Sequence, residues 1–244
     1  MVDPPTPSAP PAAPPAESPQ DLWLAELGKA DNYTRWIHAQ LAPHLGARVL
    51  EIGCGTGTLS ALLAEGSERF LAVDSDPAYA EAAHRRLAHW SRAEARHADA
   101  TRLELDEVFD TVIMLDVLEH IERDVALLAR LREFLNPGGG LIVKVPAGPG
   151  LYSSMDEVVG HHRRYSSEVL RDAFKAAGFS DTRVWPFNVF GIPGWWWNGK
   201  VLRRTMPPGS QIAAFDRLVP LFRAVESLLR PPVGLSLFAL GRID

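Results

Sequence analysis

Residues 49–57 read VLEIGCGTG, a short apolar run that leads into three glycines, Gly53, Gly55 and Gly57. An apolar, β-rich run followed at once by glycines is typical of a buried strand that turns directly into a helix. Glycine accepts positive φ and lets the backbone approach a ligand, and the N–H groups that open the helix point to the same place. The stretch predicts a strand–turn–helix unit. Such a unit either binds a nucleotide-like molecule or binds no ligand, because a glycine-rich turn that only connects a strand to a helix can have the same residues.

Two common phosphate-binding motifs do not fit this turn. The dinucleotide fingerprint G-x-G-x-x-G requires a glycine where Thr58 or Ser60 stands. A Walker loop requires Gly-Lys-Ser/Thr, which does not follow. A ligand at this turn is therefore expected to be of another nucleotide-like class.

Beyond the turn, short β-rich runs alternate with amphipathic stretches, the pattern of a parallel sheet wrapped by helices. The predicted strands are Arg48–Ile52, Phe70–Asp74, Ala93–His97, Thr111–Asp116 and Leu141–Val145, and the predicted helices are Pro77–His89, Ile121–Leu135 and Ser166–Ala177. Residues 136–140, Asn-Pro-Gly-Gly-Gly, are expected to stop a helix and turn the chain.

The C-terminal part predicts two more strands, Thr182–Phe190 and Leu235–Ile243. Residues 191–234 between them are too many for a hairpin and must form an insertion, with a helix at Ala213–Leu229.

Carboxylates follow two of the predicted strands. Asp74 ends the second strand, and Asp99 follows the third. Because the carboxyl ends of parallel strands meet at one edge, these groups are expected beside the glycine turn. A carboxylate such as that of Asp74 can accept hydrogen bonds from both hydroxyls of a ribose.

Length and composition narrow the remaining possibilities. The 244 residues suit one domain, and eight prolines among the first twenty predict a disordered tail over 1–20 before a domain over 21–244. The net charge of −5 argues against nucleic acid as a partner. The single cysteine, Cys54, excludes an internal disulfide framework. We find no secretion signal and no transmembrane run, so a cytoplasmic location is expected.

Five segments together resemble, in order, the motifs of class I S-adenosylmethionine-dependent methyltransferases. They are VLEIGCGTG, LAVDSDP, HADA, FDTVIMLDVLEHI and NPGGGLIVKVP, and the resemblance covers roughly residues 32–243. It implies a Rossmann-like, seven-stranded, mostly parallel sheet with one reversed edge strand and helices on both faces. It also implies S-adenosylmethionine as cofactor.

The resemblance assigns cofactor contacts by position. It implies Glu51, Gly53, Gly55 and Gly57 around the methionine half, Asp74 on the ribose, Asp99 and Ala100 by the adenine, and Leu115 beside the methionine moiety. Residues 32–36 resemble a helix that closes over the cofactor, with Tyr33 or Arg35 as a contact. The aromatic residues there suit ordinary helix packing equally well.

A base for the reaction is expected in residues 160–166, GHHRRYS, where His161 or His162 can act near neutral pH. The stretch resembles a G-H-x-R-R-Y-S signature in a bacterial branch of the family, whose histidine falls on the predicted catalytic residue His161. His162 is expected to contact the substrate. The alternative is structural, in which these residues tie the loop to Asp156, Glu157 or Asp116 by charged hydrogen bonds.

Residues 116–120, Asp-Val-Leu-Glu-His, resemble the E-x-x-E-H segment that holds a divalent ion in ubiquinone-type O-methyltransferases. Asp116 has a shorter arm than the glutamate of that pattern, and the L-E-H element also occurs in metal-free relatives. We therefore expect no metal here and take Asp116 as a residue that lines the substrate pocket.

The insertion differs in charge from the rest of the chain. Residues 191–230 hold six basic and two acidic side chains, so their net charge is +4 and that of the remainder is −9. Three tryptophans, 195–197, precede the basic run. We expect a substrate cap over 191–234 with Trp195 on the substrate. A peripheral membrane patch and an ordinary helical cap are the alternatives.

The expected function is methylation of a small acceptor, either lipophilic or acidic, by an O-methyltransferase of bacterial secondary metabolism. One alternative is a metal-assisted quinone- or catechol-type O-methyltransferase, and another is a non-catalytic cofactor-binding or membrane-associated scaffold. A nucleic-acid amine methyltransferase would have N/D-P-P-Y/F after the fourth strand, where this chain has Leu115-Asp-Val-Leu118.

Overall fold

The computed structural model describes residues 18–244, so most of the tail predicted over 1–20 lies outside the described residues. Its last two residues, Pro19 and Gln20, instead begin helix α1 (Pro19–Leu27). The Ser18 side chain accepts a hydrogen bond from the Asp21 N–H, and the Asp21 carboxylate accepts one from the Ser18 N–H. This capping box, with proline in the first helical turn, starts a helix within a proline-rich composition.

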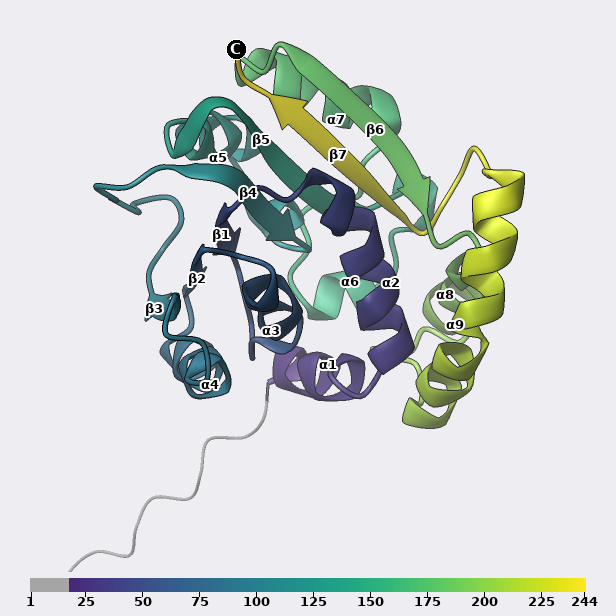
Figure 1. Ribbon diagram of the computed structural model, residues 1–244. Helices are drawn as coiled ribbons and strands as arrows, with labels where there is room; N and C mark the ends of the chain where they lie inside the picture. Colours follow the sequence, from purple (N-terminus) through teal and green to yellow (C-terminus); the bar gives the residue numbers. More distant parts are fainter. Residues whose placement is uncertain (1–17) are drawn as a thin grey trace, which may run out of the picture.

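The seven strands form one sheet in the order β3-β2-β1-β4-β5-β7-β6, shown in Figure 1. Their bounds are β1 Arg48–Ile52, β2 Arg69–Asp74, β3 Ala93–His97, β4 Phe109–Leu115, β5 Leu135–Pro146, β6 Asp181–Phe187 and β7 Ser236–Arg242. Strand β7 runs antiparallel to both of its neighbours, and the other pairs are parallel. The predicted seven-stranded, mostly parallel sheet is confirmed, but the reversed strand β7 lies between β5 and β6 and is not the edge strand that was expected.

Helices cover both faces of the sheet, as expected for buried parallel strands. The helical elements are α2 Asp31–Leu41, η1 Ala42–His44, α3 Thr58–Glu65, α4 Pro77–Leu87, η2 Leu118–His120, α5 Asp124–Arg132, η3 Pro149–Leu151, α6 Ser154–Val158 and α7 Ser167–Ala176. Strand residues alternate between two core clusters: Leu50 and Ile52 pack with α5 and α7, whereas Val49 packs with α2, α3 and α4.

The segment at 121–140 differs from its prediction. The helix predicted over Ile121–Leu135 is the shorter α5, and Leu135 already pairs with Phe109 in the sheet. The Pro-Gly-Gly-Gly stretch lies inside β5, where the register shifts before Thr111 pairs with Gly140. An irregularity of this kind accommodates a proline without an N–H, and Gly138 supplies a φ of 76°.

The insertion leaves and rejoins the sheet at one edge. Because β5 and β6 both run antiparallel to β7, β6 ends and β7 begins at the carboxyl edge of the parallel strands. Between them lie α8 (Gly191–Trp196), the π-helical turn η4 (Trp197–Val201) and α9 (Gly209–Leu229). In Figure 1, α8 and α9 lie at the side of the molecule beyond α2. The insertion predicted over 191–234 is therefore helical.

Helix α9 is fixed to the domain through α2. The Asp216 carboxylate accepts hydrogen bonds from the N–H groups of Asn32 and Tyr33, at 3.4 and 2.8 Å. Among residues 18–244, no helix combines the length and the apolar content that crossing a membrane requires.

Candidate functional site

The turn after β1 has the geometry that only glycine permits. Gly53 and Gly57 have φ of 74° and 77°. A Cβ on Gly53 would lie 2.2 Å from the Val117 side chain, and one on Gly57 would lie 2.9 Å from the Ala83 Cα. Positive φ and close neighbours together exclude larger residues. The close approach of Gly53 to Val117 also means that the turn packs on the segment that follows β4.

Asp74, at the end of β2, braces this turn. One carboxylate oxygen accepts the Gly55 N–H at 2.8 Å, and the other accepts the Asp76 N–H at 2.9 Å. The side chain lies at the edge where the sequence analysis expected it, although only 8% of the residue is exposed. Each carboxylate oxygen has a further lone pair, so Asp74 can brace the turn and still accept from a ligand hydroxyl.

Glu51 lies buried beneath the turn, where its carboxylate accepts a hydrogen bond from the Ser60 hydroxyl at 2.5 Å. Burial raises the pKa of Glu51 to about 7, because the charged form loses water, and the charge of Asp74 raises it further. The Ser60 hydrogen bond opposes this shift. Near neutral pH, Glu51 therefore changes its protonation state directly under the glycines.

The residues after β3 lie at the same edge. The Ala98 N–H donates to the Asp74 carbonyl at 2.8 Å, which holds the start of this loop beside β2. Asp99 is exposed, and its carboxylate accepts both the N–H and the hydroxyl of Thr101 at 2.8 Å. These bonds lower the pKa of Asp99. Ala100 is half-buried against the core.

Helix α1 also reaches the turn, a contact that the sequence analysis missed. A Cβ on Gly55 would be 3.4 Å from a methyl group of Leu24, so this side chain lies over the middle glycine. The Tyr79 hydroxyl of α4 donates to the Asp21 carboxylate at 2.5 Å and anchors the helix. The capping box at Ser18 and Asp21 was the available signal, hidden by the prolines that precede it.

The helix predicted around 32–36 is α2, and its two candidate contacts differ. The Tyr33 ring packs between Trp36 and Phe187, with ring centroids 6.3 and 5.8 Å away. Burial raises the pKa of Tyr33, and the nearby positive charge of Lys144 opposes this. Arg35 is exposed and lines a surface hollow shared with α9.

A buried lysine faces the end of β4. Lys144 on β5 is 3% exposed, and its ammonium group donates to the carboxylate of Asp116, whose side chain is about half exposed. Burial lowers the pKa of Lys144, but the charge and hydrogen bond of Asp116 outweigh it, so the net pKa is raised. Asp116 has a φ of 53°, and half-buried Leu115 precedes it. The Asp116 carboxylate is thus held by Lys144 at the carboxyl edge of the sheet, directly after β4.

The signature segment forms a buried network centred on Asp156 of α6. One oxygen of its fully buried carboxylate accepts His161 Nδ1 at 2.9 Å and Arg164 Nε at 2.8 Å. The other accepts the Ser153 N–H at 2.8 Å. Of the three acidic residues considered as partners for this loop, Asp156 holds both His161 and Arg164. His162 is exposed.

Glu119 meets this network from the other side. Its carboxylate is fully buried, and among the described residues neither oxygen has a hydrogen-bond partner. Burial raises the pKa of Glu119 well above its ordinary value, and the charge of Asp116 raises it further. His161 Nε2 lies 3.6 Å from one of these oxygens.

Glu119, His120 and His161 could together hold a cation, because their ligand atoms lie within 4.8 Å of one another. One carboxylate and two imidazoles suit a borderline divalent ion, and the bond from His161 Nδ1 to Asp156 is of the kind that orients metal-bound histidines. These three candidate ligands differ from those of the Asp116–His120 segment that resembles a metal site. Asp116 is paired with Lys144, and His161 takes its place beside Glu119 and His120.

The insertion packs on the same network. The Arg164 guanidinium carbon lies over the Trp195 ring, 4.4 Å from the centroid of that ring. The indole N–H of Trp195 donates to the Leu151 carbonyl at 3.2 Å. Trp196 and Trp197 are about half exposed. Of the three adjacent tryptophans, Trp195 is the one that faces the site.

Comparisons with known proteins agree with the fold and with the glycine turn. Residues 50–141 match the model of a family described as a methyltransferase domain. The demethylmenaquinone methyltransferase of Clavibacter sepedonicus is 38% identical over 104 residues, which cover 42% of each chain. The ubiquinone biosynthesis O-methyltransferase of Azorhizobium caulinodans is 36% identical over 105 residues, again 42% of each chain. The match thus spans less than half the length of these curated relatives.

Solved structures share the fold over most of the chain. The N-methyltransferase NodS of Bradyrhizobium japonicum, in complex with S-adenosyl-L-homocysteine, aligns with a TM-score of 0.56 and 16% identity, covering 89% of this chain and 88% of that one. Phosphoethanolamine N-methyltransferase 2 of Haemonchus contortus, in complex with S-adenosyl-L-methionine, aligns with a TM-score of 0.63 and 19% identity, covering 93% and 57%. The predicted Rossmann-like class is confirmed.

The buried Glu51 predicts a specific pH dependence of stability. Its folded pKa is raised to about 7, so its stabilising contribution is complete below its ordinary pKa and is lost as the pH rises through 7. Relative to Glu51→Gln, the wild type should lose on the order of 3 kcal/mol of unfolding free energy over that rise. Urea unfolding at several pH values measures this, with exposed Glu68→Gln as control. A difference between wild type and Glu51→Gln that stays constant with pH contradicts the prediction.

Proposed function

We propose that this chain transfers the methyl group of S-adenosylmethionine to a small molecule, a proposal supported by the match of residues 50–141 to a methyltransferase-domain model and by the strand order of the sheet. The observation that carries the proposal is a single juxtaposition. The glycine turn braced by Asp74 contacts Val117, the residue between Asp116 and the Glu119–His161 cluster. A cofactor site and a group of titratable side chains therefore adjoin along one sheet edge.

The chain's own residues divide the work of this reaction. When bound, S-adenosylmethionine supplies an electrophilic methyl group that its positively charged sulfur already activates. The glycine turn and Asp74 hold the cofactor, with Asp99 and Ala100 beside its adenine. Leu24 covers the turn and excludes water, which favours the in-line approach of an acceptor.

His161 serves as the base in this proposal. Asp156 accepts from Nδ1, and this selects the tautomer in which Nε2 keeps its lone pair. An acceptor hydroxyl oxygen would bond to the methyl carbon as the carbon–sulfur bond breaks, Nε2 would take the hydroxyl proton, and Asp156 would stabilise the resulting imidazolium. Asp156 is a positioning residue, held in turn by Arg164 and the Ser153 N–H.

The acceptor we propose is a lipophilic molecule with a hydroxyl group. One matched relative is named a demethylmenaquinone methyltransferase and another a ubiquinone biosynthesis O-methyltransferase, and the second name supports methylation of an oxygen atom. The cap at 191–234 places Trp195 on the Arg164 side of the network. Half-exposed Asp116 and exposed His162 are the polar groups proposed to contact the acceptor. A role in bacterial secondary metabolism and a cytoplasmic location stay predictions.

Metal-assisted O-methylation is a second candidate, favoured by one observation. The buried Glu119 carboxylate has no hydrogen-bond partner among the described residues, and a cation would neutralise it. Glu119, His120 and His161 would hold this ion, which would lower the pKa of an acceptor hydroxyl. In the base mechanism, Glu119 instead stays protonated, as its raised pKa allows.

Cofactor binding tests the proposed activity directly. Calorimetry should detect binding of S-adenosylmethionine and of its demethylated product to the wild type. Asp74→Ala should bind at least about tenfold more weakly, because a charged acceptor and the brace of Gly55 are both lost. Exposed Asp172→Ala is the control, and circular dichroism checks the fold. A wild type that binds neither ligand excludes the methyltransferase activity.

His161→Ala should keep cofactor binding and lower turnover at least about tenfold at neutral pH, because the proposed proton acceptor is lost. Asp156→Asn should lower turnover and shift its pH profile, since the imidazolium loses its counter-charge. Turnover of labelled cofactor across pH measures both effects, with exposed His89→Ala as control. If His161→Ala turns over at the wild-type rate, the residue is not the base.

Chelation separates the two mechanisms. We expect turnover to survive dialysis against a chelator, because His161 Nε2 can take the proton without an ion. The metal-assisted mechanism instead requires loss of turnover, recovery with added divalent ion, and weaker binding of that ion by Glu119→Gln in a titration without substrate. That combination would replace the base mechanism with the metal-assisted one.

A further inference from the structure

Helix α9 has a second apolar side that faces away from the domain. Leu218, Leu221 and Leu228 are 49, 59 and 80% exposed. Their spacing of three and seven residues places them on one side of the helix. Val219 faces the core instead, one residue beyond Leu218. Helix α9 is therefore apolar both toward the protein and toward solvent.

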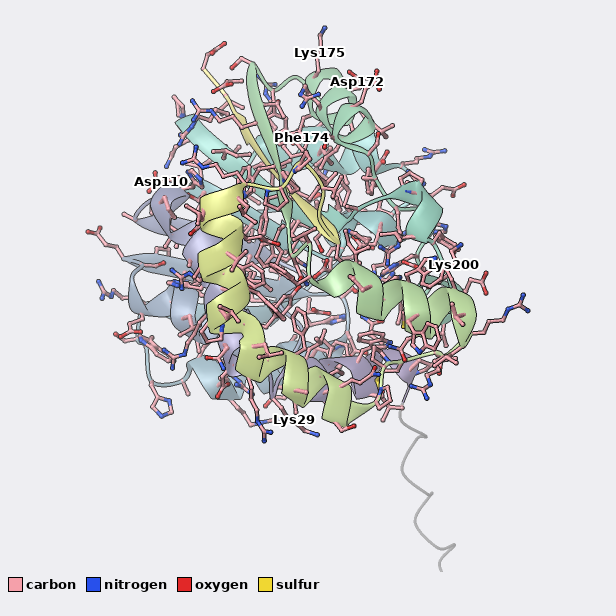
Figure 2. All side chains as sticks on the ribbon, turned by 90° about the vertical axis from the view of Figure 1, so that its right-hand side faces the viewer. Lys29, Asp110, Asp172, Phe174, Lys175 and Lys200 are labelled. Atoms are coloured by element: carbon pink, nitrogen blue, oxygen red, sulfur yellow. The ribbon has the colours of Figure 1, made fainter. Side chains whose placement is uncertain are left out.

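The other helical part of the insertion adds to this surface. Trp196, Trp197, Val201 and Leu202 are 42–50% exposed on α8 and η4. Figure 2 shows α8, η4 and α9 together on the side of the molecule that faces the viewer, with Lys200 marking η4. We call the exposed apolar and basic side chains of residues 196–230 the insertion face, leaving out Arg223, which lines the hollow between α9 and α2. Several large apolar side chains exposed on one side of a molecule are typical of an interaction site.

Charge identifies the partner. The basic residues of the insertion are all exposed: Lys200, Arg203, Arg204, Arg217, Arg223 and Arg230. Its two acidic residues are turned inward. Asp216 accepts from the backbone N–H of Tyr33, and Glu226 accepts from the backbone N–H of Asn188. The insertion face is thus cationic and apolar, without a compensating carboxylate from residues 191–230.

We propose that the insertion face docks on the surface of an anionic lipid bilayer. Leucine and tryptophan side chains enter the boundary between headgroups and acyl chains, while arginine and lysine reach the lipid phosphates. A second copy of this chain fits less well, because pairing two such faces would bring ten positive charges together. The inference deepens the proposed function: a lipophilic acceptor would be drawn from the bilayer through a cap that already lies on it.

Vesicle flotation without any cofactor or acceptor tests the docking separately from the methyltransferase activity. The full chain should float with vesicles of phosphatidylglycerol and phosphatidylcholine, and bind pure phosphatidylcholine at least about tenfold more weakly. High salt should reduce the binding to the mixed vesicles, because it screens the arginines. Equal binding to both vesicles, or to neither, overturns the proposal whether or not the chain binds S-adenosylmethionine.

Variants locate the surface. Leu221→Asp with Leu228→Asp should reduce flotation at least about tenfold, because two charges would enter the headgroup boundary. Lys200→Glu with Arg217→Glu should reduce flotation to a similar extent, because two positive charges that attract the lipid phosphates are lost. The matched controls are Val169→Asp and Arg171→Glu, exposed on α7, which packs on the opposite sheet face. Controls that lose binding as much as the insertion-face variants would place the contact elsewhere and overturn the proposal.

The molar mass in solution tests whether a second copy of this chain, rather than a lipid bilayer, covers the insertion face. Light scattering without lipid should give a monomer for the wild type. A dimer that the leucine variants dissolve, together with no flotation, would assign the insertion face to a second copy and overturn lipid docking.

Discussion

A carboxylate with no exposed surface can remain charged only if positive groups and N–H donors surround it, and Asp156 meets that requirement in this protein. Its bonds to His161, Arg164 and Ser153 join α6 to the segment before α7. Arg164 extends the network to the Ala147 carbonyl after β5 and to the ring of Trp195 in the insertion. One buried charge therefore fixes the imidazole, the sheet edge and the cap relative to one another.

The carboxyl edge of the sheet joins two kinds of site. On one side, the backbone dominates: three glycines with positive φ keep the turn free of side chains and leave room for a ligand. On the other, charged side chains dominate, and they are compensated in pairs, Asp116 by Lys144 and Asp156 by Arg164. Glu119 lacks such a partner among the described residues, so its state depends on a proton or a cation. Binding and reactivity are thus assigned to neighbouring strands.

Local geometry explains what the sequence could predict. The glycine turn and Asp74 stand directly at the ends of predicted strands, so the local sequence was enough to predict them. Lys144 was missed because it stands within an apolar run and its partner is 28 residues away. The choice of Asp156 over Glu157 depends on which carboxylate α6 turns inward. The proline-rich composition concealed α1, and the glycines after Pro137 concealed the start of β5, because composition does not reveal a capping box or a strand irregularity.

Because β7 lies between β5 and β6, the cap over residues 191–234 can be exchanged for another segment without changing the sheet. Both ends of the insertion emerge at the same edge of the sheet, so any segment threaded between them comes out over the reactive groups. Because the entropy of closing a loop grows only slowly with its length, this segment can be lengthened or exchanged at small cost to the sheet. The same scaffold can therefore come to bind new small molecules during evolution by recombining about forty residues, with the glycine turn and its strands left intact.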